Sequence, residues 1–509
     1  MRKLAITTAA QTEYAMRRQG RVTRASRRRL AMLAACPVMA AAAMVLPGHG
    51  IAQARAAAYP YRLVDPGTFG GPQSFANGPA VPLTEQGGLL GTADTAIPDA
   101  DYPNFNPFMV GFPDRYLVHA FELRRGQLTD LGALPGNNSS AVFEVNGNGV
   151  GVGMSETATT DPYTGWPADN AVMFKNGQVL NLGTLPGGYE SQANDINDRG
   201  QVSGFASNGT PDPFSLFGWG TQARSFIWQN SIMRDIGTLG GPDAVSTTLN
   251  AAGQITGQSY TSSTANPATG IPTLDPFLWA GGHMRDLGTL GGTIGFANWL
   301  NNAGEVAGTS DLAGDQTNHP FLWNGSKMID LGTLGGTNGS ANWVSDAGAV
   351  TGSADLADGT HHAYLWQNGH MRNLPPVESA PCSNGNAVND GGAVVGNITN
   401  CHGDELAAML WANGHAYDLN TLIAPSALHL FEADYINGQG QIVGRGVLPN
   451  GDQHIFLLIR NPTVPIPAAA PSTRTLHAGT WRTAPASARP CAALPAAVAA
   501  KLVVCSRKQ

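Results

Sequence analysis

The sequence is poor in charged residues, in cysteine and in long apolar segments. Asp, Glu, Lys and Arg make up 13% of its 509 residues, about half the usual share in globular proteins. There are five cysteines, and after residue 54 no segment is long and apolar enough to span a bilayer as a helix. Glycine is abundant instead, with 64 residues. This balance is typical of a sheet-rich protein with many turns.

Negative charge is concentrated in the middle of the chain. The net charge is −7, but residues 1–54 contribute +8 and residues 461–509 contribute +6, which leaves −21 for residues 55–460. An acidic segment of this size repels nucleic acid and anionic lipid surfaces. We therefore expect no nucleic-acid partner.

Residues 1–54 resemble an export signal. They carry nine Lys or Arg residues, an apolar stretch at Leu30–Pro47 and a small-residue cleavage site at Ala52-Gln53-Ala54. A membrane anchor is the alternative, and Arg27-Arg28-Arg29 weakly resembles a twin-arginine signal. A lipobox-like Cys36 would permit lipidation. We expect a secreted or periplasmic protein with no transmembrane segment once the signal is removed.

The rest of the chain is organised by a repeat built on the sequence DLGTLGG, which must be recognised before any fold is assigned. Two intact copies begin at Asp286 and Asp330. The first is followed by the Asn-x-x-Gly turn Asn301–Gly304, the second by Ser345–Gly348 in place of that turn, and each then by an aromatic run such as His319–Trp323. The acidic or amide residue that opens the motif recurs at Asp65, Asp130, Asn181, Asp235, Asp286, Asp330, Asn373 and Asp418.

Each repeat contains four short apolar segments that are divided by Gly- and Asn-rich turns. The segments are too short for helices and predict four β-strands, which we call a, b, c and d. Because strand c is apolar on both faces, every sheet needs a neighbour on each side. The sequence therefore predicts an all-β fold, a β-propeller of four-stranded blades at residues 55–460.

The ends of the repeat array predict how the propeller closes. The last repeat has strands a, b and c but no d, and an unassigned strand at Tyr61–Asp65 precedes the first repeat. If that strand completes the last blade, eight blades result and both exposed edges disappear. The weak first repeat, Phe75–Arg125, leaves seven blades as the alternative. Residues 461–509 are rich in Ala and Pro and predict a disordered tail.

Two cysteines flank one predicted hairpin. The turn Asn389–Gly392 lies about midway between Cys382 and Cys401, so the hairpin would bring them opposite each other. We expect a disulfide bond, with two free thiols as the alternative.

The repeat pattern, HAFLW-NG-M-DLGTLGG, resembles the HAF family of probable extracellular bacterial repeats. His119-Ala120-Phe121 carries the triplet that names the family, and His362-Ala363-Tyr364 is a near copy. The resemblance covers residues 61–460 and implies an exported protein of unknown activity. It supplies no catalytic residues.

The repeated polar residues predict structure rather than chemistry. An Asp present in most repeats suits a turn that accepts backbone N–H groups. The His of strand c is replaced by Ser or Pro in other repeats, so it is not a dedicated metal ligand. The repeated Trp residues are expected in the core. No nucleophile elbow, phosphate-binding loop or calcium loop is present, and we predict no catalytic residue, no metal and no cofactor.

The connections between strands b and c differ between repeats and are longest in the first four. Insertions that vary between repeats map to one face, often the binding face. Aromatic side chains offer flat apolar surfaces to sugars or peptides. The predicted ligand-binding residues in these insertions are Tyr102, Phe105, Tyr163, Trp166, Phe217 and Trp219. The alternative is that these side chains fold back and cap the loops.

Three functions remain open. The first is an exported, monomeric binding or scaffolding propeller that recognises a glycan or a cell-surface protein through the b–c loops of the first four blades. The second is a glycan-active hydrolase or lyase that uses acids of the same loops, which requires two carboxylates close together in a central pocket. The third is a structural envelope protein without a ligand.

Overall fold

The computed structural model describes residues 58–77, 80–84, 87–102, 115–136, 138–267, 269–377 and 380–467. The predicted signal 1–54 with Cys36, residue Phe105 and the tail from residue 468 lie outside the described residues. Within the described part, the chain is almost entirely β-strand, and its one helical turn is η1 (Leu419–Thr421). None of the described helices is long and apolar enough to span a membrane. The all-β prediction is confirmed.

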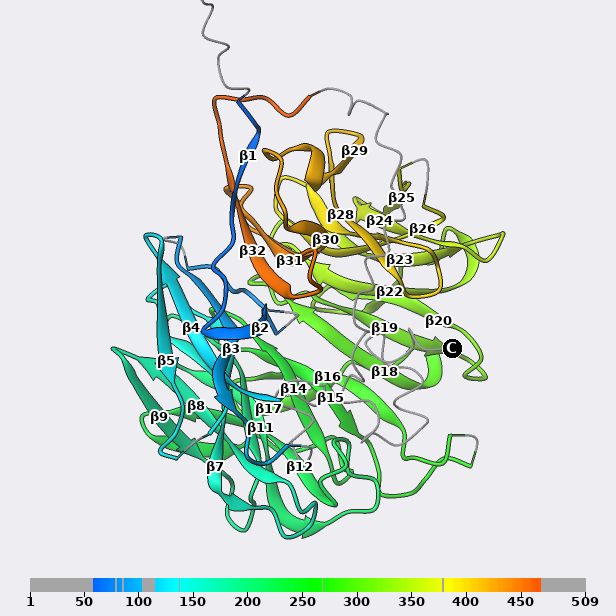
Figure 1. Ribbon diagram of the computed structural model, residues 1–509. Helices are drawn as coiled ribbons and strands as arrows, with labels where there is room; N and C mark the ends of the chain where they lie inside the picture. The colour runs from blue at the N-terminus through cyan, green and yellow to red at the C-terminus, as the bar shows by residue number, and fades with distance from the viewer. Residues whose placement is uncertain are drawn as a thin grey trace, which may run out of the picture. The chain divides into compact units, whose positions relative to one another are not determined.

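The strands form successive four-stranded antiparallel units in sequence order, which we number sheets 1 to 8 (Figure 1). Sheet 1 consists of β2 (Gly70–Phe75), β3 (Leu89–Pro98), β4 (Tyr116–Arg124) and β5 (Gln127–Gly132), and sheet 2 of β6 (Ser140–Val145), β7 (Gly151–Thr160), β8 (Pro167–Lys175) and β9 (Gln178–Gly183). Sheet 3 consists of β10 (Ser191–Ile196), β11 (Val202–Pro211), β12 (Thr221–Gln229) and β13 (Ile232–Asp235). Sheet 4 consists of β14 (Ala244–Leu249), β15 (Ile255–Tyr260), β16 (Leu274–Ala280) and β17 (His283–Asp286).

Sheets 5 to 8 repeat the same order of strands a, b, c and d. Sheet 5 consists of β18 (Gly291–Leu300), β19 (Val306–Leu312), β20 (Asn318–Trp323) and β21 (Met328–Asp330), and sheet 6 of β22 (Gly335–Val344), β23 (Val350–Leu356), β24 (His361–Gln367) and β25 (His370–Leu374). Sheet 7 consists of β26 (Cys382–Val388), β27 (Val394–Thr399), β28 (Glu405–Ala412) and β29 (His415–Asp418). Sheet 8 consists of β30 (His429–Ile436), β31 (Ile442–Val447) and β32 (Gln453–Arg460) with β1 (Tyr61–Val64).

The fourth strand of sheet 8 comes from the other end of the chain. β1 pairs antiparallel with β32, so that Tyr61 lies opposite Arg460 and Val64 opposite Leu457. This is the predicted pairing of the N-terminal strand with the last strand, and it is confirmed. Single parallel pairs also join neighbouring units: Gln73 of sheet 1 with Gln453 of sheet 8, and Leu274 of sheet 4 with Ile294 of sheet 5.

The Asn-x-x-Gly turn between strands a and b joins neighbouring sheets as well as strands. In sheet 4, the Asn250 side-chain oxygen accepts from the N–H groups of Ala252 and Gln254, while Gly253 adopts a φ of +82°, which glycine tolerates without a steric penalty. The Asn250 side-chain NH₂ then donates to the carbonyl oxygen of Asn301 in sheet 5, at 3.0 Å. Equivalent bonds run from Asn146 to Asn197, from Asn197 to Asn250, from Asn301 to Ser345 and from Asn389 to Asn437.

The Asp of the DLGTLGG motif closes a turn, as predicted. In sheet 4, Gly288 N–H donates to Asp286 Oδ1 at 2.7 Å, and the same bond joins Gly332 to Asp330. The strand c His lies beside this Asp: His319 Nδ1 is 2.8 Å from an Asp330 carboxylate oxygen. Where strand c carries a His, this contact holds the turn against its own sheet.

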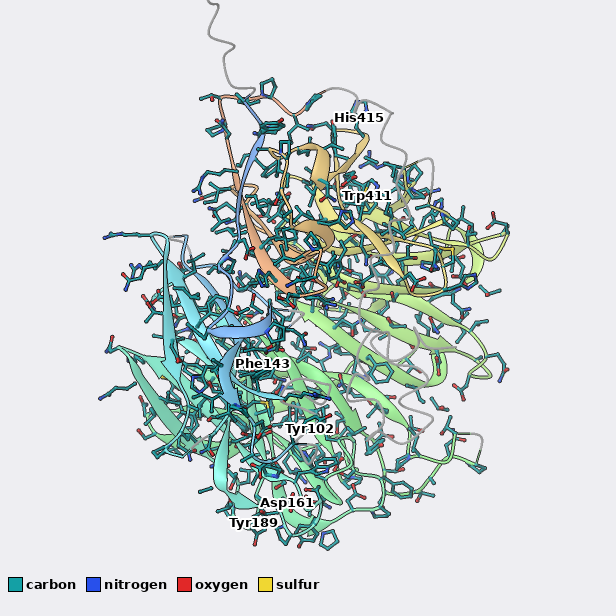
Figure 2. The ribbon with its side chains drawn as sticks, in the orientation of Figure 1. Tyr102, Phe143, Asp161, Tyr189, Trp411 and His415 are labelled. Atoms are coloured by element: carbon teal, nitrogen blue, oxygen red, sulfur yellow. A yellow bond between two sulfur atoms is a disulfide. The ribbon has the colours of Figure 1, made fainter. Side chains whose placement is uncertain are left out.

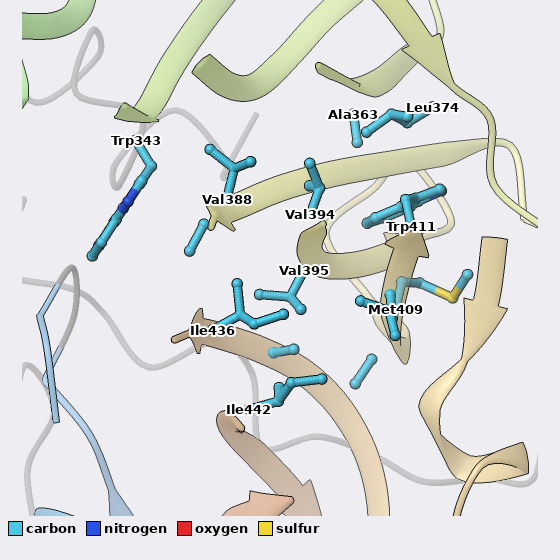
Figure 3. Packing of buried hydrophobic residues seen from close by; sticks show 14 of the residues in the cluster. Trp343, Ala363, Leu374, Val388, Val394, Val395, Met409, Trp411, Ile436 and Ile442 are labelled. Atoms are coloured by element: carbon cyan, nitrogen blue, oxygen red, sulfur yellow. The ribbon is translucent and has the colours of Figure 1, made fainter. Parts of the chain in front are cut away.

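Apolar side chains fill the space between successive sheets. Figure 3 shows Val395 of sheet 7 beside Ile436 and Ile442 of sheet 8, while Val394 and Trp411 lie on the opposite face, towards Ala363 and Leu374 of sheet 6. Of the repeated Trp residues predicted to be core, Trp228, Trp323 and Trp411 are buried, whereas Trp279 and Trp366 are half-buried.

The predicted disulfide bond joins Cys382 to Cys401, with 5.3 Å between their Cα atoms. The described structure also extends past residue 460. Tyr417 Oη donates to the Pro467 carbonyl oxygen at 2.9 Å, so Pro467, which the sequence assigns to the tail, lies against sheet 7.

Candidate ligand-binding site

The first three sheets carry hairpins that are longer than those of the other sheets. Strands β3, β7 and β11 each have ten residues, whereas the corresponding strands of sheets 4 to 8 have six or seven. The last residues of β3, β7 and β11 are exposed. The predicted b–c insertions of the first three repeats are therefore extensions of regular hairpins.

The three extensions are built alike. In each, three residues of strand b lie opposite one of strand c, which is a β-bulge: Glu156 pairs with Asp169 and Thr160 with Pro167. The side chain at the bulge accepts from the N–H two residues later: Thr159 N–H donates to Thr157 Oγ1 at 3.2 Å. In the first hairpin, Asp94 pairs with Val118 and Pro98 with Tyr116, and Ile97 N–H donates to the Thr95 side chain. In the third hairpin, Ser207 pairs with Ala223 and Pro211 with Thr221, and Thr210 N–H donates to the Asn208 side chain.

An aspartate forms the turn at each hairpin tip. Asp161 Oδ1 accepts from Tyr163 N–H at 2.8 Å, and Asp161 N–H donates to the Trp166 carbonyl oxygen at 2.9 Å. In the same way, Asp99 Oδ1 accepts from Asp101 N–H, and Asp212 Oδ1 accepts from Phe214 N–H. These carboxylates hold the backbone, and the short sequences TAIPD, TATTD and NGTPD mark them. Sequence reasoning missed this second repeat because it lies inside segments that differ in length.

Two tyrosines meet at the tip of the second hairpin. Tyr163 is 48% exposed and Tyr189 is 41% exposed; their ring centroids are 6.4 Å apart at 65°. Tyr163 Oη donates to the Gly209 carbonyl oxygen of β11 at 3.1 Å, so this ring bridges sheets 2 and 3. Figure 2 shows Asp161 and Tyr189 close together there. Tyr189 was not predicted, because it belongs to a connection between strands d and a.

Tyr102 lies on the first hairpin and is 41% exposed. The Arg115 guanidinium carbon is 5.7 Å from its ring centroid. Tyr102 lies three residues after Asp99 on sheet 1, whereas Tyr163 lies two residues after Asp161 on sheet 2, where Asp101 holds the matching position of the first hairpin. Phe105, the other predicted residue of this hairpin, lies outside the described residues.

The third hairpin folds inward. Phe217 stacks on Phe205 with ring centroids 4.3 Å apart, and Trp219 is 2% exposed. Tyr260 Oη donates to the Phe214 carbonyl oxygen at 3.1 Å and fastens the loop to sheet 4. Trp166 is half-buried against the same cluster. Of the predicted aromatic residues that are described, Tyr102 and Tyr163 are exposed, whereas Trp219 is buried.

A group of buried carboxyls lies between sheets 2 and 3. Asp169 is 1% exposed, and neither of its carboxyl oxygens has a hydrogen-bond partner within the described part of the chain. Burial, followed by the neighbouring Glu190 and Glu156 carboxylates, raises the pKa of Asp169 well above its ordinary value. Burial raises the pKa of Glu156 to about 7, although the Ser139 N–H donates to it at 2.7 Å.

Among the residues that the structure describes, no group of three or more His, Cys, Asp or Glu side chains is arranged to hold a metal ion. Two acids of the b–c hairpins accept backbone N–H groups: Gln73 N–H donates to Asp94, and Ser139 N–H donates to Glu156. These contacts give Asp94 and Glu156 a part in the fold, whereas the Asp169 carboxyl has no such contact within the described residues.

No family model and no curated protein matches the sequence, so the resemblance to the HAF family stays a prediction. Among solved structures, the β-propeller domain of the Trilobed protease from Pyrococcus furiosus is 8% identical, with a TM-score of 0.38, over 69% of this chain and 96% of that one. An ulvan lyase of polysaccharide lyase family PL25 is 11% identical, with a TM-score of 0.33, over 79% and 96%. The SapL1 lectin in complex with α-methyl fucoside is 12% identical, with a TM-score of 0.27, over 56% and 97%. Since these likenesses are weak, function must be argued from this chain's own residues.

Proposed function

We propose that this protein is an exported binding propeller that recognises a glycan through its b–c hairpins. The observation that carries the proposal is the pair Tyr163 and Tyr189, which is about half exposed at a tip held rigidly by hydrogen bonds. Large apolar rings on the surface of a protein mark interaction sites when the surrounding structure holds them in place. Tyrosine suits a sugar, since its ring covers an apolar sugar face while its hydroxyl stays polar.

The remaining predicted residues divide into contact and support. Tyr102 and Tyr163 contribute the exposed rings, with Tyr189 added to them. Phe217 and Trp219 support the surface from below, where they pack on Phe205. Trp166 lies between these roles, half-buried at the base of the second tip. Phe105 stays a proposed member of the first hairpin.

We infer that the eight sheets close into a ring, with β1 as the last strand. Side chains from sheets that are not neighbours in sequence support this arrangement. The ring centroids of Trp343 in sheet 6 and Tyr435 in sheet 8 are 5.7 Å apart. Burial, and then the Glu144 carboxylate of sheet 2, raise the pKa of Tyr435. Residues of strand a from sheets 2, 6 and 8 would meet in this way at the axis of a closed ring.

Export follows from two separate features. Residues 1–54 have the composition of a signal peptide, and the Cys382–Cys401 disulfide bond is of a kind that persists in oxidising compartments. We therefore propose a secreted or periplasmic location.

The alternatives have less support. A hydrolase or lyase would need carboxylates free to act on a substrate, whereas the hairpin acids Asp99, Asp161 and Asp212 accept turn N–H groups. A structural envelope protein without a ligand would leave the exposed tyrosine pair without a role. A cell-surface protein partner remains the second candidate, since exposed tyrosines also suit protein interfaces.

A binding screen of residues 55–467 against polysaccharides, glycan arrays and surface proteins tests the proposal. We expect glycan binding that Tyr163→Ala with Tyr189→Ala weakens by roughly tenfold or more, because each ring contributes about 1 kcal/mol. Ile232→Ala is the matched control. Ile232 is also about half exposed, at 50%, but it lies at the turn between strands c and d of sheet 3, at the end of the sheet away from the b–c hairpins. The proposal would be overturned if the parent, the double tyrosine variant and Ile232→Ala bound the glycan equally, or if the parent bound only a protein ligand.

A further inference from the structure

We propose that the Tyr163–Tyr189 pair binds an uncharged monosaccharide unit at the junction of sheets 2 and 3. This inference rests on the proposed function and specifies the class of ligand at one site. Three segments build the site, and all of them belong to the described part of the chain. They are residues 156–166 of the second b–c hairpin, residues 184–190 of the connection that enters sheet 3, and residues 205–223 of the third b–c hairpin.

The two tyrosines are placed by the same short segment of β11. Tyr163 Oη donates to the Gly209 carbonyl oxygen at 3.1 Å, and Tyr189 N–H donates to Ser207 Oγ at 2.9 Å. Gly187 passes so close to Gly209 that a Cβ on Gly209 would collide with the Gly187 carbonyl oxygen. The ring centroids, 6.4 Å apart, are therefore fixed before any ligand arrives. A preorganised site loses little conformational entropy on binding.

The segments that build the site present no charged side chain to solvent. They contain no Lys or Arg, and their charged residues are four acids. All four are buried, from 0% to 7% exposed. Each accepts a backbone N–H group: Glu156 from Ser139, Asp161 from Tyr163, Glu190 from Asp169 and Asp212 from Phe214. These carboxylates hold the fold.

Uncharged polar groups lie beside the pair. The Asn208 side-chain NH₂ donates to Gln222 Oε1 at 3.0 Å, and both side chains are half-buried. The first charged side chain further along β12, Arg224, is already paired with Asp235 at 3.1 Å. Amides and hydroxyls exchange hydrogen bonds with sugar hydroxyls, while a tyrosine ring covers an apolar sugar face. A uronate or sulfated sugar would lose hydration here without gaining a cationic partner.

The experiment compares sugars that differ in charge. Ligand-observed NMR measures the affinity of the protein for N-acetylglucosamine and for methyl glucoside and methyl galactoside, beside glucuronate, galacturonate and glucosamine. We expect an uncharged sugar to bind about fivefold more tightly than its acidic counterpart. Added salt should change this affinity by less than about twofold, because no ion pair forms. Tyr163→Ala with Tyr189→Ala should weaken binding by about tenfold or more.

A charge introduced beside the pair sharpens the test. Thr210 is exposed and follows Gly209, whose carbonyl oxygen accepts from Tyr163. Thr210→Lys should tighten glucuronate binding by about threefold to fivefold and leave methyl glucoside binding within about twofold of the parent. Thr210→Gln, which adds length without charge, is the matched control and should bind both sugars like the parent. Thermal melting checks that each variant is folded.

The outcomes separate this inference from the proposed function. Acidic sugars that bind as tightly as uncharged ones, or glucuronate binding that Thr210→Lys leaves unchanged, would overturn the inference and leave glycan recognition intact. A preference for glucosamine over N-acetylglucosamine would show that the rings bind a cation, which also overturns it. Failure of every sugar in this series to bind would overturn the inference, and the glycan screen of residues 55–467 then decides the proposed function separately.

Discussion

The His454 ring lies beside the Asp65 carboxylate, with Nδ1 and a carboxylate oxygen 2.9 Å apart, although 389 positions separate the two residues. The same pair occurs within single repeats at a separation of 11 positions, as in His119 with Asp130 and His319 with Asp330. Asp65 therefore occupies the position of a strand d aspartate in sheet 8. The N-terminal strand does not merely lie near the last sheet; it takes the place of its missing strand.

Replacing Asp65 tests whether the N-terminal strand serves as strand d of sheet 8. Asp65→Ala removes the contact with His454 and the bond from Gly67 N–H at 2.8 Å, and we expect a loss of about 1 kcal/mol in unfolding free energy. Asp330→Ala, with the same contacts inside sheet 5, is the matched control. Only Asp65→Ala should speed hydrogen exchange of the Tyr61–Val64 amides. Equal exchange of these amides in both variants would show that Asp65 does not hold the strand.

The ionisation of Asp65 adds a pH dependence to the same contact. Burial raises the pKa of Asp65, but the hydrogen bonds from His454 and Gly67 outweigh it and leave the pKa below its ordinary value. A carboxyl whose folded pKa is depressed stabilises the protein above its ordinary pKa of about 4 and ceases to do so as the pH falls further. Asp65→Asn should flatten the acid limb of the stability profile between about pH 5 and pH 2.

The inter-sheet asparagines predict a second mutational effect. Asn250→Ala removes the bond to Asn301 and leaves the Ala252 and Gln254 N–H groups without their acceptor, which we expect to cost about 1–3 kcal/mol.

Asn250→Ser is the informative control, because Ser345 fills the equivalent position in sheet 6. The Ser345 hydroxyl accepts from the N–H groups of Ala347 and Ala349. Serine should therefore keep the turn N–H contacts and lose only the bonds that the Asn250 NH₂ makes to the Asn301 carbonyl oxygen and to Gln254 Oε1, for about 1 kcal/mol. Equal losses for serine and alanine in urea denaturation would show that the turn contacts are unimportant.

The disulfide bond predicts a third effect. Cys382 and Cys401 enclose a loop of 19 positions, for which the chain-entropy argument gives about 3 kcal/mol of stabilisation. Cys382→Ala with Cys401→Ala should lower the unfolding free energy by roughly this amount, and added reductant should have the same effect on the parent protein but none on the variant. A double variant as stable as the parent would contradict the prediction.

The sequence predicted the features that repeat and missed those that are local. The DLGTLGG spacing predicts the four-stranded units, because a periodic pattern reports the same packing demand many times over. It also predicts the pairing of Tyr61–Asp65 with the last strand. Burial of single side chains could not be predicted in the same way. Trp219 and Tyr163 are both aromatic residues in b–c insertions, yet one packs on Phe205 and the other is exposed.

Two features of the site depend on contacts between repeats. Tyr189 is brought to Tyr163 only because sheet 3 lies against sheet 2. The first three b–c hairpins contain the short sequences TAIPD, TATTD and NGTPD, and the bulge that each sequence forms shows that the three are structurally equivalent. A search for repeats inside the insertions would have found them.

Asp169 gives the last prediction, which concerns pH. Its carboxyl is buried beside Glu190 and Glu156, and its pKa is raised well above the ordinary value by burial and by those two neighbours. A carboxyl whose folded pKa is raised binds its proton more tightly in the folded state than in the unfolded state. The unfolding free energy therefore falls as the pH rises from about 4 towards the folded pKa.

Asp169→Asn removes this ionisation while keeping the size of the side chain. We expect the variant to be more stable than the parent above neutral pH, with little difference near pH 5, when melting temperature is followed from pH 5 to pH 9. Glu156→Gln is the contrasting variant: Glu156 titrates at about 7 but accepts the Ser139 N–H, so the gain from losing its charge is offset by a weaker hydrogen bond. A parent protein whose stability is flat across this range, or an Asp169→Asn variant that is destabilised above neutral pH, would show that Asp169 is held by a partner in its charged form.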